Sequence, residues 1–538
     1  MRIVLVVADQ RGARHYELVL RELAKRGHQI HIAMRFDDRD EPRLRRQGVA
    51  APVNELVERL CREHDGISRG IAPVRGDRWG ALAEPLRRGS NYLRYLSPPY
   101  READRLRARA ARLAPRPVVR ISGWPLLRTE LGRQRLDSVM RWLDSMIPES
   151  PNIIGCLRNL CPDLVIVSPL VAGPWQVDYV RAARRLGLRT AVLVPSWDNL
   201  TNKGLMLTIP DRVYVWNDDQ FREAVDLHAV PHGRVIVTGA HTFDHWFSWR
   251  PSTTSGEFRK RVELSSDEPM LLYVCSSKSI SPDEPAFVRR WLTALRSHPS
   301  DRIASANVLI RPHPNAAELW QGTGIEEMPG VAVWPRIGDY NVTADSQSNY
   351  FDSIFHSSAV VGLNTSALIE SAIVGKRVFT VLDPEIHQGQ EGTLHFRYLL
   401  RANGGPLTVA TDFEQHLEQL SRALAEPPRD ARTDPGFVHR FLRPHGLEAP
   451  ASPILADAIE MQLASAAPSA HGHGFRRRSG AIALWPAATV ASRAARRRRS
   501  IKPQDQRRAV WRVARRTVKR GRRALRRARQ AARVRGRR

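Results

Sequence analysis

Hydroxyl, amide and carboxyl side chains follow one short apolar run in an order that suits the binding of an anion. In GLNTSALIE, residues 362–370, an apolar segment ends in a polar turn, and a helix is expected to begin near Ser366. The first backbone N–H groups of a helix have no partners, and the helix dipole adds positive potential there. Because Thr365 and Ser366 add hydroxyls beside those groups, the turn suits an anion such as a diphosphate.

Glu370 lies one turn further into the expected helix, on the face of Ser366. A carboxylate at this place can accept hydrogen bonds from the diol of a ribose. Asn364 precedes the two hydroxyls in the same turn. The stretch also fits a plain N-capped helix with one surface acid, and taken by itself it favours that simpler interpretation.

Two further loops follow apolar runs in the same half of the chain. Ser276 and Ser277 come after MLLYVC, and Arg311 and His313 belong to RPHP, which comes after NVLI. If these runs are neighbouring parallel strands, their carboxyl ends meet at one edge of a sheet, where such sheets bind ligands. We therefore expect the three loops to bind one phosphate group together, although His313 alone fits loop packing equally well.

The spacing of apolar residues predicts an α/β protein in two halves. Up to about residue 250, short apolar runs alternate with helical patterns, beginning with RIVLVVA, YELVLRELAKRG and QIHIAM. After a linker rich in Pro, Ser and Thr, the alternation resumes at PMLLYVCS. This rhythm is typical of parallel sheets covered by helices. We expect two doubly wound, Rossmann-like domains that face a cleft, an acceptor-side domain at residues 1–250 and a nucleotide-donor domain at 251–450.

Two segments depart from this rhythm. Residues from about 37 to 148 are rich in Arg and helical in pattern, and we interpret them as a helical insertion without a clear strand. Residues 451–538 are expected to form a linker and a disordered Arg-rich tail. Residues 470–538 hold 25 Lys and Arg against one acid, a net charge of +24 within the chain's total of +29. The high charge therefore belongs to the tail and does not mark the whole chain as nucleic-acid binding.

Several common chemistries have no support in the sequence. The chain has no GxxxxGK[ST] loop, no GxGxxG after an apolar run, no HExxH and no GxSxG. Its four cysteines lack zinc spacing. Asp38 and Asp40 form an Asp-x-Asp motif, but they stand among many charges and fit a solvated loop better than a metal site. We expect neither a bound metal nor a cofactor other than the donor substrate.

The apolar runs are also too short for membrane insertion. The first run has about six residues, too few for the apolar region of a signal peptide. No run approaches the roughly 20 residues of a membrane-spanning helix. We expect a cytoplasmic protein, with peripheral attachment to the inner face of the membrane as a hypothesis.

Several short motifs, taken in their order along the chain, resemble those of a known superfamily. RGH at Arg26–His28, RPHP, GLNTSALIE and VGKRV look similar to GT-B glycosyltransferases, nearest the CDP-glycerol glycerophosphotransferase-like group of surface-polysaccharide transferases. PSWDNLTNKG, VWNDDQ and TGAHTFDHWF resemble an uncharacterised branch of this superfamily. The resemblance covers about residues 1–447, weakly across the helical insertion. It implies two Rossmann-like domains, of which the second holds a nucleotide-activated donor.

The resemblance also implies roles for individual residues. Glu370 would hold the ribose of the nucleotide, Thr365 and Ser366 the diphosphate, and His313 a phosphate or the transferred group. The catalytic-base motif of the glycerophosphotransferases has no clear match in this chain. The transferred group is therefore open between a sugar and glycerol phosphate.

Transfer to a hydroxyl group needs a base, because the hydroxyl loses its proton as it attacks. We expect this base to come from the first domain, across the cleft. Asp198, in PSWDNLTNKG, is the first candidate, and Trp197 beside it can raise its pKa or stack on a sugar. His15, near the loop after the first apolar run, is the second. Asp198 also fits the simpler role of a turn residue or helix cap.

Together these features predict a metal-independent transferase. It would move a sugar or glycerol phosphate from a nucleotide-diphosphate donor to a cell-surface glycan or a lipid-linked acceptor. A nucleotide-sugar 2-epimerase and a non-catalytic scaffold tethered by the tail are the alternatives. For the tail, residues 476–538, we favour an anionic membrane surface, at about 1 kcal/mol per Lys or Arg. Nucleic acid fits less well, because few aromatic residues interleave with the arginines.

Overall fold

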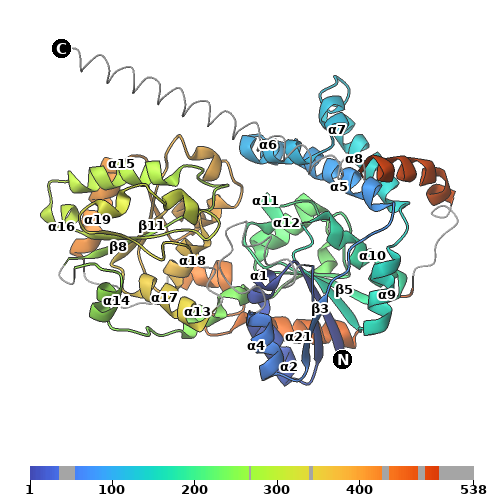
Figure 1. Cartoon of the computed structure of the whole chain (residues 1–538), viewed down its shortest axis with the longest axis horizontal. Coiled ribbons are helices and arrows are strands. Elements are labelled where there is room, and N and C mark those ends of the chain that lie inside the picture. The colour runs from blue at the N-terminus through green and yellow to red at the C-terminus, as the bar shows by residue number, and fades with distance from the viewer. Residues whose placement is uncertain are drawn as a thin grey trace, which may run out of the picture.

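The protein folds around two separate parallel β-sheets, seen side by side in the computed structural model (Figure 1). The structure describes residues 1–35, 55–171, 173–265, 268–338, 343–426, 435–470 and 479–495. Asp38, Asp40 and the end of the tail, 496–538, lie outside the described residues. The two sheets have seven and six strands, which confirms the expected fold class of two doubly wound α/β domains.

Strands and helices alternate along the first domain. Its strands are β1 (Arg2–Val7), β2 (Gln29–Met34), β3 (Ile67–Ile71), β4 (Leu164–Val167), β5 (Arg189–Leu193), β6 (Arg212–Val215) and β7 (Val235–Val237). Its helices are α1 (Gln10–Ala13), α2 (Glu17–Lys25), α4 (Glu55–Glu63), α5 (Gly80–Arg94), α6 (Asp104–Leu113), α7 (Arg116–Ile121), α8 (Glu130–Ser145), α9 (Pro151–Leu160), α10 (Val177–Arg185), α11 (Asn199–Asn202), α12 (Asp218–His228) and α13 (Asp244–Ser248).

The second domain repeats the alternation. Its strands are β8 (Met270–Val274), β9 (Asn307–Arg311), β10 (Val331–Val333), β11 (Ala359–Gly362), β12 (Val378–Val381) and β13 (Leu407–Ala410). The helices after β7 and α13 are α14 (Ser255–Arg261), α15 (Glu284–Arg296), α16 (Asp301–Ala304), α17 (Ala344–Phe355), α18 (Ser366–Ile373), α19 (Phe413–Ala425), α20 (Pro435–Phe437) and α21 (Ala451–Ala464). Short 3₁₀ helices join several of them.

Both sheets bury apolar side chains on both faces. In β1, Ile3 and Leu5 face the layer of α2, α4 and α21, while Val4 and Val6 face the layer of α9, α10 and α12. This alternation follows from the two-residue period of a strand. The apolar core continues in the second domain, where α15 and α19 cover one face of the sheet and α14, α17 and α18 the other.

The strand order places the loops that matter for function. The orders are β3-β2-β1-β4-β5-β6-β7 and β10-β9-β8-β11-β12-β13, and paired strands run parallel. In each sheet the chain first adds strands toward one edge and then toward the other, and the change of direction falls between β1 and β4 in the first sheet and between β8 and β11 in the second. Loops that leave the carboxyl ends on either side of such a point diverge and open a crevice. The candidate residues after β1, β5, β8, β9 and β11 all lie in loops of this kind.

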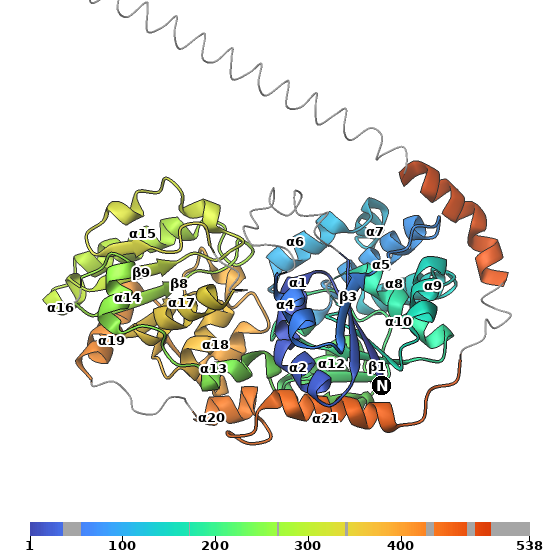
Figure 2. The same cartoon turned by 60° about the horizontal axis from the view of Figure 1, so that its bottom comes forward.

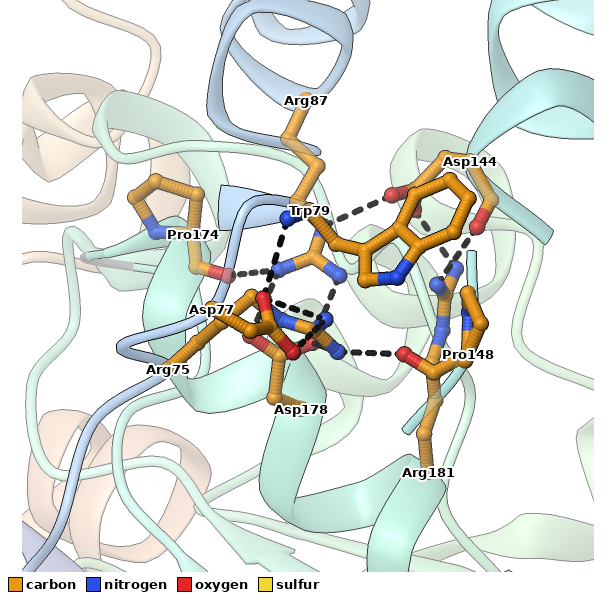
Figure 3. Close-up of polar contacts among 9 residues, drawn as sticks. All are labelled: Arg75, Asp77, Trp79, Arg87, Asp144, Pro148, Pro174, Asp178 and Arg181. Carbon is orange, nitrogen blue, oxygen red and sulfur yellow. Dashed lines mark hydrogen bonds and ion pairs between the residues drawn. The ribbon is translucent and has the colours of Figure 1, made fainter. Parts of the chain in front are cut away.

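The helical insertion is fixed to the first domain by a buried network of ions (Figure 3). Arg87 of α5 contacts Asp178 of α10 at 2.8 Å and Asp144 of α8 at 3.0 Å. Arg181 of α10 contacts Asp144 at 2.6 Å, and Arg75 contacts Asp178 at 3.2 Å. Burial alone would raise the pKa of Asp178, but Arg87 and Arg75 outweigh it and lower that pKa. The network therefore ties α5, α8 and α10 together.

Three segments differ from the sequence-based expectation. The insertion contains the edge strand β3, whose sequence ISRGI was not recognised because an edge strand buries few apolar residues. Residues 451–464 form α21 rather than a linker, and Leu455 and Ile459 pack into the core of the first domain. Residues 479–495 form a helix rather than disordered tail (Figure 2), and Ala488 is buried in a small cluster with Ala83 of α5.

The chain crosses between the domains twice, because α21 returns to the first domain after the second is complete. Asp244 accepts hydrogen bonds from the backbone N–H groups of Ala451 and Ser452 and so fixes the start of α21. Among the described helices, none is long and apolar enough to span a bilayer.

Candidate active site

Two adjoining cavities lie where the loops of the two domains meet. The larger has a volume of about 600 Å³ and the smaller about 320 Å³. Both draw walls from the first and the second domain. They share Ser196, His313, Asn315, Thr365 and Ser366. The start of α18 therefore stands between them.

The backbone of the GLNTS turn explains why these residue types follow β11. At Gly362 a Cβ atom would lie 2.9 Å from the carbonyl oxygen of Val274, so the close approach of β8 and β11 requires glycine. Asn364 donates its backbone N–H to Ser276 Oγ at 3.3 Å. Thr365 has extended backbone angles and caps α18 through Ala367 N. The turn thus delivers Thr365 and Ser366 to the cavities.

Glu370 lines the larger cavity and accepts a hydrogen bond from the hydroxyl of Tyr350. Burial raises the pKa of Glu370, and the bond from Tyr350 lowers it in part. Arg311 packs against the ring of Tyr350, with its guanidinium carbon 4.8 Å from the ring centre, and donates to Ser353 at 2.9 Å. Arg311 therefore supports the Tyr350–Glu370 pair from behind and also borders the cavity.

His313 presents a hydrogen-bond donor to both cavities. Its Nδ1 accepts from the backbone N–H of Asn315 at 3.0 Å. Burial, and next the charge of Arg14, lowers the pKa of His313 to about 4, so the ring is neutral near pH 7. A neutral ring whose Nδ1 accepts must carry its proton on Nε2. His313 can therefore donate to a phosphate oxygen, as the sequence predicts.

The two serines after β8 have different roles, and one prediction is wrong. Ser276 is fully buried and lines neither cavity; its N–H donates to Glu284 and its hydroxyl fixes Asn364. Ser276 therefore supports the turn and does not reach a ligand. Ser277 borders the smaller cavity and contacts Ser279 at 2.7 Å. From the sequence, the two hydroxyls could not be distinguished.

Trp197 joins the domains directly. Its indole N–H donates to Ser366 Oγ at 3.1 Å, and its ring lies edge-on to His395 with centroids 4.5 Å apart. The ring is buried, so it does not offer a face for stacking on a sugar. The hydroxyl of Ser366 is thereby fixed at the junction of the two cavities.

Asp198 lies in the smaller cavity, with a pKa opposite to the expected direction. Burial alone would raise its pKa, but Lys203, 3.3 Å away, and the hydroxyl of Ser196 help to outweigh burial, and the pKa is lowered. The net direction is opposite to the rise that Trp197 suggested. An acid with a low pKa is a weak base, which makes Asp198 a poor partner for a hydroxyl proton. It stands at the N-cap of α11 without capping it through its side chain.

His15 lines the larger cavity from the 3₁₀ turn Arg14–Tyr16 after β1. Its Nδ1 contacts Thr242 Oγ1 at 3.0 Å. Burial, and next Arg14, lowers the pKa of His15 to about 3, so the ring is neutral and, like Asp198, a weak base in the empty cavity. A bound anion nearby would raise that pKa. Because an anionic donor would make the ring more basic, His15 remains the base candidate of the larger cavity.

Several lining residues escaped the sequence-based prediction. Arg14, His241 and His245 border the larger cavity, and Arg105, Lys203 and His395 border the smaller. TGAHTFDHWF and PSWDNLTNKG contain three of them, but nothing in a single sequence shows which residues of a motif reach a cavity. Arg105 comes from α6 of the insertion, whose arginines all look alike in the sequence.

No set of three His, Cys, Asp or Glu side chains within the described ranges is arranged to hold a metal ion. The histidines around the larger cavity are instead neutral rings, because burial lowers the pKa of His241 and His245 to about 3.

Comparisons with known proteins find fold-level similarity only. No protein-family model and no curated protein matches this sequence. A glycosyltransferase from Rickettsia africae has a TM-score of 0.48 at 10% identity, over 87% of this chain and 99% of that one. UDP-GlcNAc 2-epimerase from Neisseria meningitidis has 0.46 at 12%, over 86% and 100%. Acinetobacter baumannii MurG has 0.39 at 12%, over the same shares. Similarity of this degree assigns no role to any residue here.

Proposed function

We propose that the larger cavity binds a nucleotide-diphosphate donor and that the protein transfers the group this donor carries. The transferred group is a sugar or glycerol phosphate, and the acceptor is a cell-surface glycan or a lipid-linked hydroxyl compound. One observation supports this most strongly. The start of α18, the Tyr350–Glu370 pair and His313 border one cavity, which His15 of the first domain also lines.

Each part of such a donor has a matching group in the cavity. The Glu370 carboxylate, oriented by Tyr350, can accept from both hydroxyls of a ribose. The N–H groups at the start of α18 and His313 Nε2 can donate to the diphosphate. Because Thr365 and Ser366 border both cavities, a diphosphate there would direct the transferred group toward the smaller one.

The chemical step follows from this order. If the transferred group is a sugar, the acceptor oxygen attacks its anomeric carbon, the bond from that carbon to the diphosphate oxygen breaks, and the nucleoside diphosphate leaves with the electron pair. If it is glycerol phosphate, the acceptor oxygen attacks the outer phosphorus, the bond from that phosphorus to the bridging oxygen breaks, and the nucleoside monophosphate leaves with the electron pair. In both cases Arg14 and the start of α18 can stabilise the negative charge of the leaving group. The hydroxyl proton moves to His15. In this proposal the protein's own groups supply the positive charge, so no metal ion is required.

Calorimetric titration with UDP, CDP and GDP tests the proposal. At least one nucleotide should bind, and Glu370→Gln should weaken it about tenfold, the effect of losing roughly 1.4 kcal/mol. Glu418→Gln is the matched control, because Glu418 lies on the exposed surface of α19 and pairs only with Arg422. If all three nucleotides fail to bind, the donor site does not exist.

The two alternative functions predict other outcomes of turnover experiments. A nucleotide-sugar that is converted without any acceptor would identify an epimerase. Nucleotide binding without turnover of any donor, whatever the acceptor, would favour a scaffold. Transfer that depends on an acceptor supports the proposal.

A further inference from the structure

The smaller cavity combines positive charge with unused hydrogen-bonding atoms. Its walls carry three cations, Arg105, Arg109 and Lys203, and among its described lining residues Asp198 is the sole acid. Lys203 pairs with Asp198 at 3.3 Å. Arg105 donates to the carbonyl of Ile280 at 2.6 Å, and Arg109 to the carbonyl of Asn202. Neither arginine has a carboxylate partner among the residues the structure places, so the cavity has an excess positive charge.

His395 adds a buried ring nitrogen without a partner. The amide nitrogen of Asn364 donates to the carbonyl of Gly389 at 2.7 Å and to Thr393 Oγ1 at 3.1 Å, and it lies 3.5 Å from His395 Nε2. Burial lowers the pKa of His395 to about 4, so the ring is neutral. His395 is only 3% exposed, and its Nδ1 has no partner in the described protein.

The Asn364 amide oxygen is likewise buried and has no partner in the described protein, and Asn364 also lines the cavity. Both atoms are almost completely covered, so the groups that can donate to a bound anion are Arg105, Arg109 and Lys203. The cavity thus suits a small group that carries a negative charge.

We propose that the smaller cavity binds a phosphate- or carboxylate-bearing group, recognised by Arg105 and Arg109 of the helical insertion. This rests on the proposed function and narrows it: the transferred group or the acceptor is anionic. The insertion has a role here that its sequence did not show. Arg105 contacts the second domain through Ile280, and its backbone N–H donates to Gln388 at 3.1 Å, so α6 forms a wall of this cavity and is held against the second domain.

Titration with inorganic phosphate tests the proposal, in protein first saturated with UDP. Phosphate should bind, and Arg109→Gln should weaken it about tenfold while leaving the affinity for UDP within about twofold. Arg112→Gln is the matched control, because Arg112 is exposed on the same helix and does not border the cavity. Equal phosphate affinity in Arg109→Gln and the unchanged protein, or no phosphate binding at all, would overturn the proposal.

The two sources of the anion are separated by a second set of titrations. If the transferred group carries the charge, UDP-glucuronate, whose sugar bears a carboxylate, should lose affinity in Arg109→Gln relative to the uncharged sugar of UDP-glucose. If the acceptor carries it, UDP-glucuronate and UDP-glucose should lose equally little, and glycerol 3-phosphate should bind the UDP-saturated protein in an Arg109-dependent way. Should UDP itself fail to bind, the donor site is wrong, and the phosphate titration without UDP still tests this cavity.

A separate surface carries an unusual number of exposed apolar side chains. Nine of the fifteen large apolar residues that the described chain exposes lie in two segments, 113–142 and 482–490. They are Leu113, Trp124, Leu126, Leu131, Val139, Trp142, Ile482, Trp485 and Val490. We call this surface the insertion face. Helices α7, α8 and 479–495 all lie away from the second domain (Figure 2).

Helix α8 has exposed apolar residues on the side opposite to the one that it buries against α5. Met140 and Asp144 bury one side of the helix against α5. Leu131 and Trp142, eleven residues apart, fall on the opposite side at helical spacing and are 58% exposed. A helix at the surface of a soluble protein usually has polar residues there. The outer side of α8 is therefore suited to contact something apolar.

The charge around the insertion face identifies its partner. Residues 113–142 contain six Arg against two acids, Glu130 and Asp137, and residues 482–490 contain no charged residue. Arg116, Arg120 and Arg128 are exposed, and none of them has an ion-pair partner in the described ranges. Exposed Trp and Leu beside unpaired arginines match the interface of an anionic bilayer, where aromatic rings lie at the level of the headgroups.

We infer that the insertion face docks on an anionic lipid surface. This differs from attachment by the basic tail, because the apolar contacts do not depend on salt. At about 0.5 M NaCl, where the Debye length is only about 4 Å, the attraction of the tail for lipid is largely screened. Apolar insertion persists under those conditions.

Flotation with vesicles of phosphatidylcholine and phosphatidylglycerol tests this inference on the full chain in high salt. The unchanged protein should bind, and Trp124→Ser combined with Leu126→Ser should reduce binding about tenfold. Ile337→Ser combined with Met461→Ser is the control, because these exposed residues lie elsewhere. Equal binding by both double variants would contradict the inference. So would a concentration-dependent dimer that only the Trp124 and Leu126 changes abolish, since a second copy would then cover the face.

Discussion

The two walls of the cleft are built differently. The wall from the second domain consists of turns directly after strands β8, β9 and β11, in which neighbouring residues both shape the backbone and reach the cavities. The wall from the first domain draws on more widely separated segments: the turn after β1 with His15, helix α6 with Arg105, and the stretches 195–204 and 238–247, which contain Lys203 and His241. Recognition of a nucleotide is thus concentrated in contiguous motifs. Proton transfer and selection of the second group depend on residues whose positions only the tertiary structure determines.

The largest expected effect tests the chemical role of the first wall. His15→Ala removes the proposed base, so turnover of the donor should fall by about 10²- to 10⁴-fold. Its affinity for the nucleotide should change by less than about twofold, because Glu370 and α18 remain. Steady-state kinetics together with calorimetry separates the two effects. Asp198→Asn should be milder; if it abolished turnover while His15→Ala did not, the assignment of the base would be reversed.

The next effect concerns how the first wall is held in place. Asp178→Asn leaves Arg87 and Arg75 without their shared buried partner, which should cost about 3–5 kcal/mol of unfolding free energy. Denaturant titration measures this loss. Asp137→Asn is the control, because its surface pair with Arg141 is worth about 0.5 kcal/mol or less.

The pH dependence of this loss has a defined sign. Asp178 has a folded pKa below its usual value of 3.8, so its contribution is fully present above that value and disappears as the pH falls through the folded pKa. The difference between Asp178→Asn and the unchanged protein should therefore be constant near neutrality and shrink below about pH 4. A difference that grows in acid would contradict the proposed ion pairs.

A smaller effect tests the second wall. Tyr350→Phe removes the hydrogen bond that lowers the pKa of Glu370, so burial should raise that pKa further. The ionised carboxylate is present above its pKa and lost as the pH falls through it. Nucleotide affinity of the variant should therefore begin to fall at a higher pH than that of the unchanged protein. Titrations from about pH 8 to about pH 5 measure this change. If the pH profile of nucleotide affinity is the same in both proteins, Glu370 does not bind the ribose.

The last prediction is that removal of metal ions has no effect on donor turnover. Addition of EDTA should leave donor turnover unchanged, because Arg14, His313 and the start of α18 supply the positive charge in the proposed step. A loss of turnover that Mg²⁺ restores would show that these groups do not suffice.

The difference between the walls also decides how much the sequence could predict. The two-domain fold, the GLNTS turn, His313 and Glu370 were predictable, because strand–turn–helix periodicity places them at strand ends. The role expected for Ser276 was different. Its hydroxyl is buried and accepts from the backbone N–H of Asn364, and sequence spacing does not show which hydroxyl is buried. Asp198 in PSWDNLTNKG was the favoured base, but the nearby Lys203 lowers its pKa. Sequence spacing alone does not reveal that the two side chains form an ion pair.

The helical insertion shows the same limit in stronger form. Its many arginines have at least three different roles: Arg87 is buried in the ion network, Arg105 borders the smaller cavity and Arg120 is exposed on the insertion face. A helical pattern predicts that arginines lie on a helix but does not tell which surface each one meets. Residues 451–464 were taken for a linker for a similar reason, because the core they complete belongs to the other domain.

A crystal structure with bound UDP or CDP would test the central claim most directly. We predict the ribose hydroxyls within hydrogen-bonding distance of the Glu370 carboxylate, and the diphosphate between the start of α18 and His313 Nε2. The terminal phosphate should lie at the border of the two cavities, near Ser366. A nucleotide whose diphosphate lies on the first domain, or whose ribose does not contact Glu370, would contradict the account.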